Sequence, residues 1–357
     1  MEIKKLIPDE GKRLSAYKGY ELLDRLGEET VKEVVCNVLC GSNIRSLTEV
    51  LTRKRLALSN ASLLMTYLEA GQSIKNFPNN LSQIVGRELI QANLSKEEKQ
   101  YLQWLVGLTG KSVQNVLRSN ENDLLEYLND LEVALEESAA KASEIFGDLT
   151  GSFCIQGKTT NISWPILTQI FTAIGAQTLA IRGSEKSMYG KLFEKFILGS
   201  LLTILGFTYC NPEQLEQEEM LFWLSERGEK RESDATLLVR KGIAVRFDIG
   251  FIGSGNTEIS LDKVSRFEKE FELGSERYFV STIIIVDRIG ERSRIVEMAH
   301  SIGGNIVQMS MSFWVKEIAE ILRQNTDFSH PILSMSDDES LQFIRSSMKS
   351  INLKTFT

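Results

Sequence analysis

The feature that most constrains the fold is a pair of apolar runs separated by a short basic turn. Residues 234–240 read DATLLVR and residues 243–252 read IAVRFDIGFI, with Lys241-Gly242 between them. Short runs rich in β-branched residues predict strands, and a glycine between two such runs predicts a tight antiparallel hairpin. Gly242 suits the left-handed position of this turn. The chain therefore needs a sheet that includes this hairpin.

Each predicted strand of the hairpin carries an aspartate, Asp234 or Asp248. A three-residue loop pairs Val239 with Ile243 and brings Asp234 directly opposite Asp248, on one face of the sheet. A two-residue loop instead opposes Asp234 to Ile249 and places the two aspartates on opposite faces. We favour the first register because it explains both carboxylates together.

Two aspartates that face each other indicate a cation site. Like charges directly opposite on a sheet cost about 0.2–1 kcal/mol, and more when they are buried. A cation between them removes this repulsion, and two carboxylates supplemented by water are a ligand set that Mg²⁺ accepts. The alternative is purely structural, with one aspartate at the surface and the other capping a turn.

The remaining pattern predicts a helical N-terminal domain over 1–150 and an α/β domain over 151–357. Apolar residues recur at three- and four-residue spacing in the first part, where Ser95 and Glu98 form a capping-box start. The second part alternates helical and strand patterns, which predicts a mixed central sheet flanked by helices. Residues 152–183 are expected to form a strand or loop and then a helix. Further expected helices cover 184–207, 214–228, 259–275, 292–304 and 312–324, and the expected strands besides the hairpin cover 207–210, 278–288 and 305–310.

Composition limits the kinds of site and the compartment. The chain has a net charge of −7 and only two histidines, His300 and His330, so a multi-histidine metal centre is excluded. Four cysteines are too few for a disulfide framework, and no uninterrupted run of about 18 apolar residues occurs. We expect a cytoplasmic protein without a membrane span. An acidic protein that binds DNA concentrates its lysines and arginines in one cleft.

The order of these elements resembles the PD-(D/E)XK nuclease superfamily, and type II restriction endonucleases in particular, over roughly residues 184–310. The resemblance matches Asp234 to the aspartate of the PD element, with Ser233 in place of the proline. It matches Asp248 to the acidic residue of the (D/E)XK element. Glu194, in the sequence YGKLFEKF, matches the auxiliary glutamate that these nucleases often place near the metal. The resemblance implies that the three carboxylates bind the metal.

One position departs from the family pattern. Gly250 lies two residues after Asp248, where the family has a lysine. Lys263, on the next predicted helix, has a long side chain that can replace this cation, and glycine at 250 leaves space for it. Glu258 precedes that helix and is a further candidate acidic group. The expected catalytic residues are therefore Asp234, Asp248, Glu194, Lys263 and Glu258.

The resemblance implies a Mg²⁺-dependent endonuclease that hydrolyses double-stranded DNA at a specific short sequence. Because both strands of a symmetric site have to be cut, we expect a homodimer. The helical domain is then available for recognition or dimerisation. Two alternatives remain open: a catalytically inactive nuclease-fold protein that binds DNA, which Gly250 favours, and a DNA repair or junction nuclease.

Two basic groups are candidates for phosphate contacts. Arg53, Lys54 and Arg55 follow one another on a predicted helix, where they either contact phosphates or form a solvated face. A second group flanks Glu194 and is better placed for a DNA cleft: Lys186, Lys191 and Lys195.

Overall fold

The structure is a computed structural model that describes residues 2–16, 21–90, 93–115, 121–211, 219–225, 233–250, 279–287 and 304–357. It divides into two compact units. Unit 1 comprises Met1–Lys18 and Val50–Ser187, and unit 2 comprises Gly19–Glu49 and Met188–Thr357. Two long helices, α4 and α9, contain residues of both units. The expected domains, residues 1–150 and 151–357, stay a prediction, and the bounds of these compact units are different.

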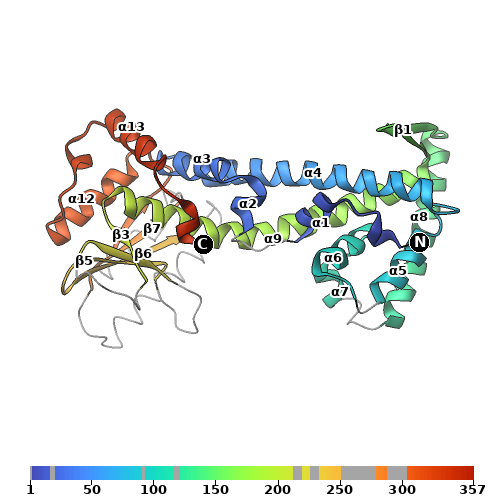
Figure 1. Cartoon of the computed structure of the whole chain (residues 1–357), viewed down its shortest axis with the longest axis horizontal. Coiled ribbons are helices and arrows are strands. Elements are labelled where there is room, and N and C mark those ends of the chain that lie inside the picture. Colours follow the sequence, from blue (N-terminus) through green and yellow to red (C-terminus); the bar gives the residue numbers. More distant parts are fainter. Residues whose placement is uncertain are drawn as a thin grey trace. The chain divides into compact units, whose positions relative to one another are not determined.

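The described residues of unit 1 form helices and one small hairpin (Figure 1). Its α6 begins with the predicted capping box, in which Ser95 and Glu98 bond reciprocally to each other's backbone N–H groups. Its elements are η1 (Ile3–Lys5), α1 (Asp9–Ser15), α4 (Ile44–Ser73), α5 (Leu81–Ile90), α6 (Lys96–Leu105), α7 (Gly110–Asn115), α8 (Glu121–Phe146), β1 (Gly151–Ile155), β2 (Lys158–Ile162) and the first part of α9 (Trp164–Ile204).

The core of unit 1 is built from the apolar faces of these helices. Tyr101, Leu102 and Trp104 on α6 are fully buried, as are Leu63 on α4 and Val85 on α5. Large side chains removed from water supply most of the stabilisation, at about 25 cal/mol per Å² of apolar surface. The helical period predicted from the sequence therefore corresponds to one shared core.

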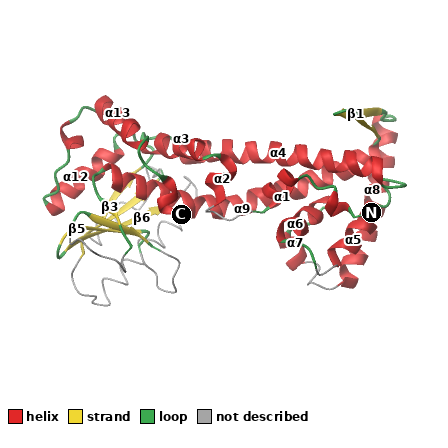
Figure 2. Ribbon diagram, viewed as in Figure 1, coloured by secondary structure: helices red, strands yellow, loops and turns green. Residues whose placement is uncertain are grey.

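Unit 2 contains the central sheet. Figure 2 shows its strands in yellow, with helices α12 and α13 in the same unit. The remaining part of α9 also belongs to it. Its other elements are α2 (Leu22–Leu26), α3 (Glu28–Leu39), β3 (Thr208–Tyr209), β4 (Leu221–Leu224), β5 (Ala235–Arg240), β6 (Ile243–Gly250), β7 (Phe279–Val286), β8 (Gly304–Gln308), α12 (Trp314–Thr326), η4 (Pro331–Ser334), α13 (Asp337–Met348) and η5 (Leu353–Phe356).

The sheet has six described strands in the order β3-β4-β5-β6-β7-β8. Strands β4, β5 and β6 form an antiparallel meander, whereas β3 runs parallel to β4, and β6, β7 and β8 run parallel to one another. This mixed topology confirms the predicted α/β fold with a mixed central sheet flanked by helices and a helical N-terminal region.

The two faces of β6 differ in polarity because side chains alternate along a strand. Val245, Phe247 and Ile249 point to one face and are fully buried. Arg246 and Asp248 point to the other face, where Arg246 is half-buried and Asp248 is 8% exposed. The hairpin is therefore anchored by one apolar face and presents charged groups on the other.

One expected element is wrong. The sequence predicts a helix over 214–228, but Leu221–Leu224 form strand β4, which pairs with both β3 and β5. An apolar and aromatic run of four residues gains more from packing into a sheet than from a helical turn when a neighbouring strand offers free backbone groups. That partner is non-local, so local propensity did not reveal it.

Helix α9 is longer than expected, and helix α13 was not expected. The segment around 164–183 and the predicted helix over 184–207 form the single helix α9. Helix α13 follows the helix that the sequence analysis takes as the last one. Its start is marked by a capping box between Ser336 and Glu339, the same pattern that identified α6. The predicted helices over 259–275 and 292–304 lie outside the described residues, apart from Gly304.

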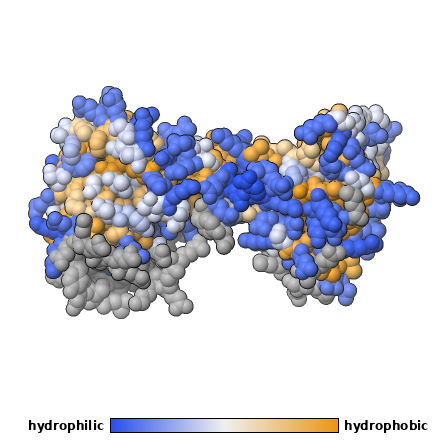
Figure 3. Space-filling model, viewed as in Figure 1, coloured by the Kyte–Doolittle hydropathy of each residue, from blue (hydrophilic) through white to orange (hydrophobic). Residues whose placement is uncertain are grey.

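By length and composition, α9 is apolar enough to cross a membrane. The core helix of a folded domain meets the same criterion, and Ala173 and Ile181 of α9 are fully buried within unit 1. One helix of this kind is therefore weak evidence for a membrane span. On the face drawn in Figure 3, apolar residues are scattered among hydrophilic ones, as is ordinary for folded domains.

Candidate active site

The β5–β6 hairpin has the register that the sequence analysis favours, although its turn differs. Ala235 pairs with Phe247, and the same register continues to the pair Leu238–Ala244. The turn itself is closed by Arg240 and Ile243, with a register shift between Leu238 and Arg240.

The expected pairing of Val239 with Ile243 is therefore wrong. A two-residue turn at Lys241-Gly242 and an extra residue, Val239, together have the same effect on register as the predicted three-residue loop. Gly242 has a φ of 79°, which is the left-handed conformation expected for it.

The hairpin register ends at the Ala235–Phe247 pair, and Asp234 lies in the bend just before β5. Continued by one residue, this register sets Asp234 opposite Asp248. The backbone N–H of Ile249 donates a hydrogen bond of 2.9 Å to Asp234 Oδ2, which fixes the orientation of this carboxylate. Asp248 is 8% exposed, so its carboxylate lies in an environment that screens charge poorly.

The backbone before β5 is held in place by Ser225, which follows β4. The Ser225 N–H donates to the carbonyl oxygen of Asp234 at 3.1 Å, and the Ser225 hydroxyl donates to the carbonyl oxygen of Ser233. Ser233 occupies the position where the family pattern has a proline. These hydrogen bonds to β4 restrict the chain at the position where a proline ring would restrict it.

The donor set of the hairpin fits a hard divalent cation. Magnesium is bound in proteins by one or two carboxylates and completes its shell with water and substrate phosphate oxygens. Asp234 and Asp248 supply two carboxylates on one face. Within the described ranges, no group of three or more His, Cys, Asp or Glu residues is placed to hold a metal ion, so the structure does not bring Glu194, Asp234 and Asp248 together as such a group.

Of the other predicted site residues, the structure describes Glu194 and Gly250. Glu194 is half-buried on the part of α9 that belongs to unit 2, and it follows the fully buried Phe193. Gly250 ends β6 and pairs with Val286 of β7. Lys263 and Glu258 lie outside the described residues.

Arg246 and Arg266 are the next candidates, after Lys263, for the cation that is missing at Gly250, and of these two only Arg246 lies within the described residues. It lies two residues before Asp248 on the same face of β6, opposite Thr236 of β5. The strand alternation in IAVRFDIG is the pattern from which its position can be read.

The expected role of the basic cluster on α4 requires a correction. Arg55 is 2% exposed, and its Nη1 lies 3.2 Å from Oε1 of Glu185 on α9. Its guanidinium also donates to the carbonyl oxygen of Leu14 at 2.7 Å and 3.0 Å. Arg55 is therefore a buried structural residue and not a phosphate contact, whereas Arg53 and Lys54 are exposed.

The cysteines at 36 and 40 belong to a structural environment in unit 2. Both are half-buried free thiols on consecutive turns at the end of α3. A hydrogen bond from Cys36, aided by the nearby Arg345, lowers the pKa of Cys40 to about 7.

Comparison with known proteins identifies the family of the chain. The family model described as CfrBI restriction endonuclease matches residues 28–294. The chain is also 38% identical over 354 residues to a protein named Type II restriction enzyme CfrBI, from Citrobacter freundii. That alignment covers 99% of this chain and 98% of the relative. No solved structure matches the chain. These matches confirm the resemblance read from the sequence, and the chain belongs to the CfrBI restriction endonuclease family.

Proposed function

We propose that this protein is a Mg²⁺-dependent type II restriction endonuclease that hydrolyses phosphodiester bonds of double-stranded DNA at a short specific sequence. The observation that carries the proposal is the opposed pair Asp234 and Asp248 on the polar face of the hairpin. Membership of a restriction endonuclease family supplies the reaction class and the DNA substrate.

In this proposal the hairpin aspartates hold the metal. The Ile249 N–H orients the Asp234 carboxylate, and the low exposure of Asp248 strengthens its attraction for a cation. When bound, Mg²⁺ polarises a phosphoryl oxygen and lowers the pKa of a coordinated water. Glu194 is the proposed third acidic residue of the site. The fully buried face of β6 keeps these groups in fixed positions during catalysis.

A cation is also needed, because hydrolysis builds negative charge on the phosphoryl oxygens. We assign the role of this cation to Lys263. Glu258 is proposed separately, as a further acidic residue of the site. Lys263→Ala should lower the cleavage rate about a hundredfold while DNA binding changes little. If Lys263→Ala cuts at the wild-type rate, Arg246 on the face of Asp248 becomes the next candidate.

The proposed assembly is a cytoplasmic homodimer. Each hairpin supplies one opposed aspartate pair, and cutting both strands of a symmetric site requires two such pairs related by a two-fold axis. Light scattering of the protein alone and with a cognate duplex should give the mass of two chains. A mass of one chain in both samples contradicts the homodimer.

The test of the function is a digestion of plasmid and phage DNA with Mg²⁺, followed by sequencing of the cut ends. We expect a single sequence at the ends, and no cutting by Asp234→Ala or Asp248→Ala. Random ends, or cutting only of nicked or branched DNA, favour a repair or junction nuclease. Sequence-specific binding without any cutting favours a catalytically inactive nuclease fold. This alternative is considered because Gly250 stands where the family has a lysine.

A further inference from the structure

The surface of unit 1 around the start of α5 has an unusual composition. Between Gln72 and Arg87 every exposed residue is an amide, a hydroxyl or a cation, although the chain has 48 acidic residues and a net charge of −7. We call this the 72–87 surface. Its exposed residues are Gln72, Ser73, Lys75, Asn76, Asn79, Gln83 and Arg87.

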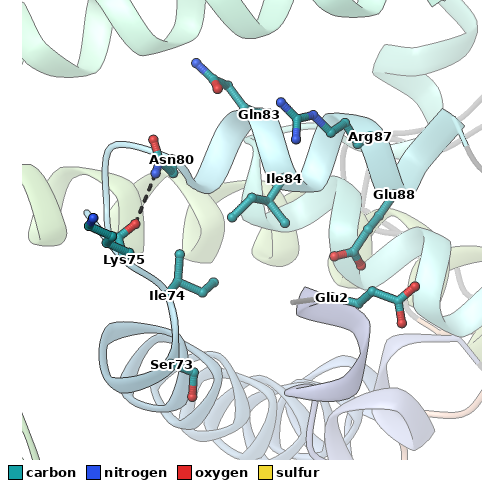
Figure 4. A pocket seen from close by; sticks show the side chains of 9 residues that line it. All are labelled: Glu2, Ser73, Ile74, Lys75, Asn80, Gln83, Ile84, Arg87 and Glu88. Carbon is teal, nitrogen blue, oxygen red and sulfur yellow. Dashed lines mark hydrogen bonds between the residues drawn. The ribbon is translucent and has the colours of Figure 1, made fainter.

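This surface borders a cleft of about 460 Å³ (Figure 4). Gln83 and Arg87 project from the same side of α5, one helical turn apart, and Ile84 lies on the other side of the helix. Asn80 donates a hydrogen bond of 3.0 Å to the carbonyl oxygen of Lys75, which fixes the turn that leads into α5. The cleft is thus a concave site with donors and acceptors at defined positions.

The carboxylates of the cleft are already engaged by the protein. Glu88 is 2% exposed and accepts hydrogen bonds from the backbone N–H groups of Ile3 and Lys4, the latter at 2.9 Å. Glu2 forms an ion pair with Lys5 at 2.8 Å. Neither Lys75 nor Arg87 forms an ion pair with any residue that the structure describes. Their positive charges therefore remain directed at solvent.

Helix α5, which carries Gln83 and Arg87, is held in place by close packing. Leu81 and Val85 are 2% and 0% exposed, and a Cβ added at Gly86 would lie 2.5 Å from Leu128 of α8. A side chain on such a helix is placed more accurately than one on a loop, which a base-reading surface requires. With ten residues, α5 is about 15 Å long, and an α-helix fits the major groove of DNA.

We propose that the 72–87 surface reads base edges of the recognition sequence in the DNA major groove. Arginine bonds bidentately to guanine, glutamine and asparagine bond bidentately to adenine, and lysine neutralises phosphate. Arg87 and Gln83 are the base-reading residues, and Lys75 is a phosphate contact. This assignment rests on the proposed function, because it names the specificity residues of the same enzyme.

The test measures binding separately from cleavage. The protein carries Asp248→Asn and is kept in Ca²⁺, and duplexes with a randomised centre are selected by binding. Affinities for the selected duplex, and for duplexes with one substituted base pair, then compare Gln83→Ala and Arg87→Ala with the parent. Because selection needs no cutting, an error in the assigned catalytic residues leaves this test readable.

Arg87→Ala should weaken binding of the selected duplex roughly tenfold to a hundredfold and remove discrimination at one base pair, with non-specific binding retained. Lys75→Ala should weaken all duplexes alike and reduce the slope of log affinity against log salt by about one. Arg13→Ala, on α1, removes an exposed arginine of unit 1 that pairs with Glu10 and should change neither quantity. Unchanged affinity and discrimination in both Gln83→Ala and Arg87→Ala, with unchanged thermal stability, overturn the proposal.

Discussion

Two pairs of charged residues with low exposure differ in the sign of their charges. In unit 1 the side chains of Arg55 and Glu185 are 3% and 2% exposed, and their Nη1 and Oε1 atoms are 3.2 Å apart. In unit 2 the hairpin register places Asp234 across from Asp248. The first pair neutralises its own charge on folding. The second pair concentrates negative charge and needs a cation from outside the pair.

The difference separates structural from functional charge. A buried pair of opposite charges, such as Arg55 and Glu185, joins two helices, and the removal of one partner strongly destabilises the folded protein. A like-charged pair lowers stability in the absence of a ligand, and such arrangements are typical of sites that bind or react. Substitutions at the two pairs should therefore have opposite consequences for stability and for activity.

The largest expected effect is on cleavage by the hairpin pair. Asp234→Asn and Asp248→Asn keep the shape of each side chain but remove its charge, so each should lower the single-turnover rate with Mg²⁺ at least about ten-thousandfold. The double variant should be no slower than either single variant, because both carboxylates act on one metal.

A matched control for this prediction is Asp327→Asn. Asp327 is 88% exposed, pairs with Arg240 and has a φ of 59°, a conformation that asparagine accepts readily. It should cut at the wild-type rate. If either hairpin variant also cuts at that rate, Asp234 and Asp248 are not the metal ligands.

The next effect is on the stability of the opposite pair. Glu185→Gln leaves the buried Arg55 guanidinium without its counter-charge, so the free energy of unfolding should fall by about 3–5 kcal/mol. The double variant Arg55→Met, Glu185→Met should recover a large part of this loss, as measured by urea denaturation.

The exposed pair of Arg13 and Glu10 provides the comparison for this measurement. Their side chains are 54% and 53% exposed, so Arg13→Ala should change the free energy of unfolding by less than about 1 kcal/mol. A loss at Glu185→Gln that is no larger than the loss at Arg13→Ala would show that burial adds nothing to the Arg55–Glu185 pair.

The contrast between the pairs also shows what sequence can predict. Alternation along 234–240 and 243–250 determines which residues share a face, so the register of the hairpin was predictable although the bulge at Val239 was not. Arg55 stands in an unbroken basic triplet. Only the position of Glu185, 130 residues away, shows that this one member points inward.

Other features depend on contacts that no local pattern contains. Strand β4 was predicted as a helix because its four apolar residues lie in a polar run, and the edge of β5 decides its conformation. The 72–87 surface was predictable in part, because the sequence already shows that amide and cationic residues are frequent in this segment. That Glu88 is buried and leaves this surface without an exposed carboxylate became evident only from the fold.

A smaller effect is expected on thermal stability when a metal ion neutralises the negative charges of Asp234 and Asp248. Millimolar Mg²⁺ or Ca²⁺ should raise the Tm of the wild type by about 2–5 °C, because a ligand that binds only the folded state stabilises it. The Asp234→Asn, Asp248→Asn double variant should show no such rise. An equal rise in both proteins, measured by calorimetry, places the bound ion elsewhere.

The smallest effect concerns Glu88, a buried carboxyl group whose largest perturbation is burial, with smaller opposing effects from the acid Glu2 and the cation Lys4. Burial raises its pKa above the ordinary 4.5, although the N–H groups of Lys4 and Ile3 oppose this shift. The folded state therefore favours the protonated form, which Glu88→Gln mimics at every pH. The stability from Glu88 is full below about pH 4.5 and is lost as the pH rises through the raised pKa.

The Tm of the wild type minus that of Glu88→Gln should thus fall by about 1–2 °C between pH 4.5 and 7. Glu98 provides a control of opposite sign in the same unit, because a hydrogen bond from Lys12 lowers its pKa. Its contribution is present above pH 4.5 and is lost as the pH falls through the lowered value. The Tm difference for Glu98→Gln should not decline over the same range. A parallel decline for both variants attributes the change to the net charge of the protein and not to the burial of Glu88.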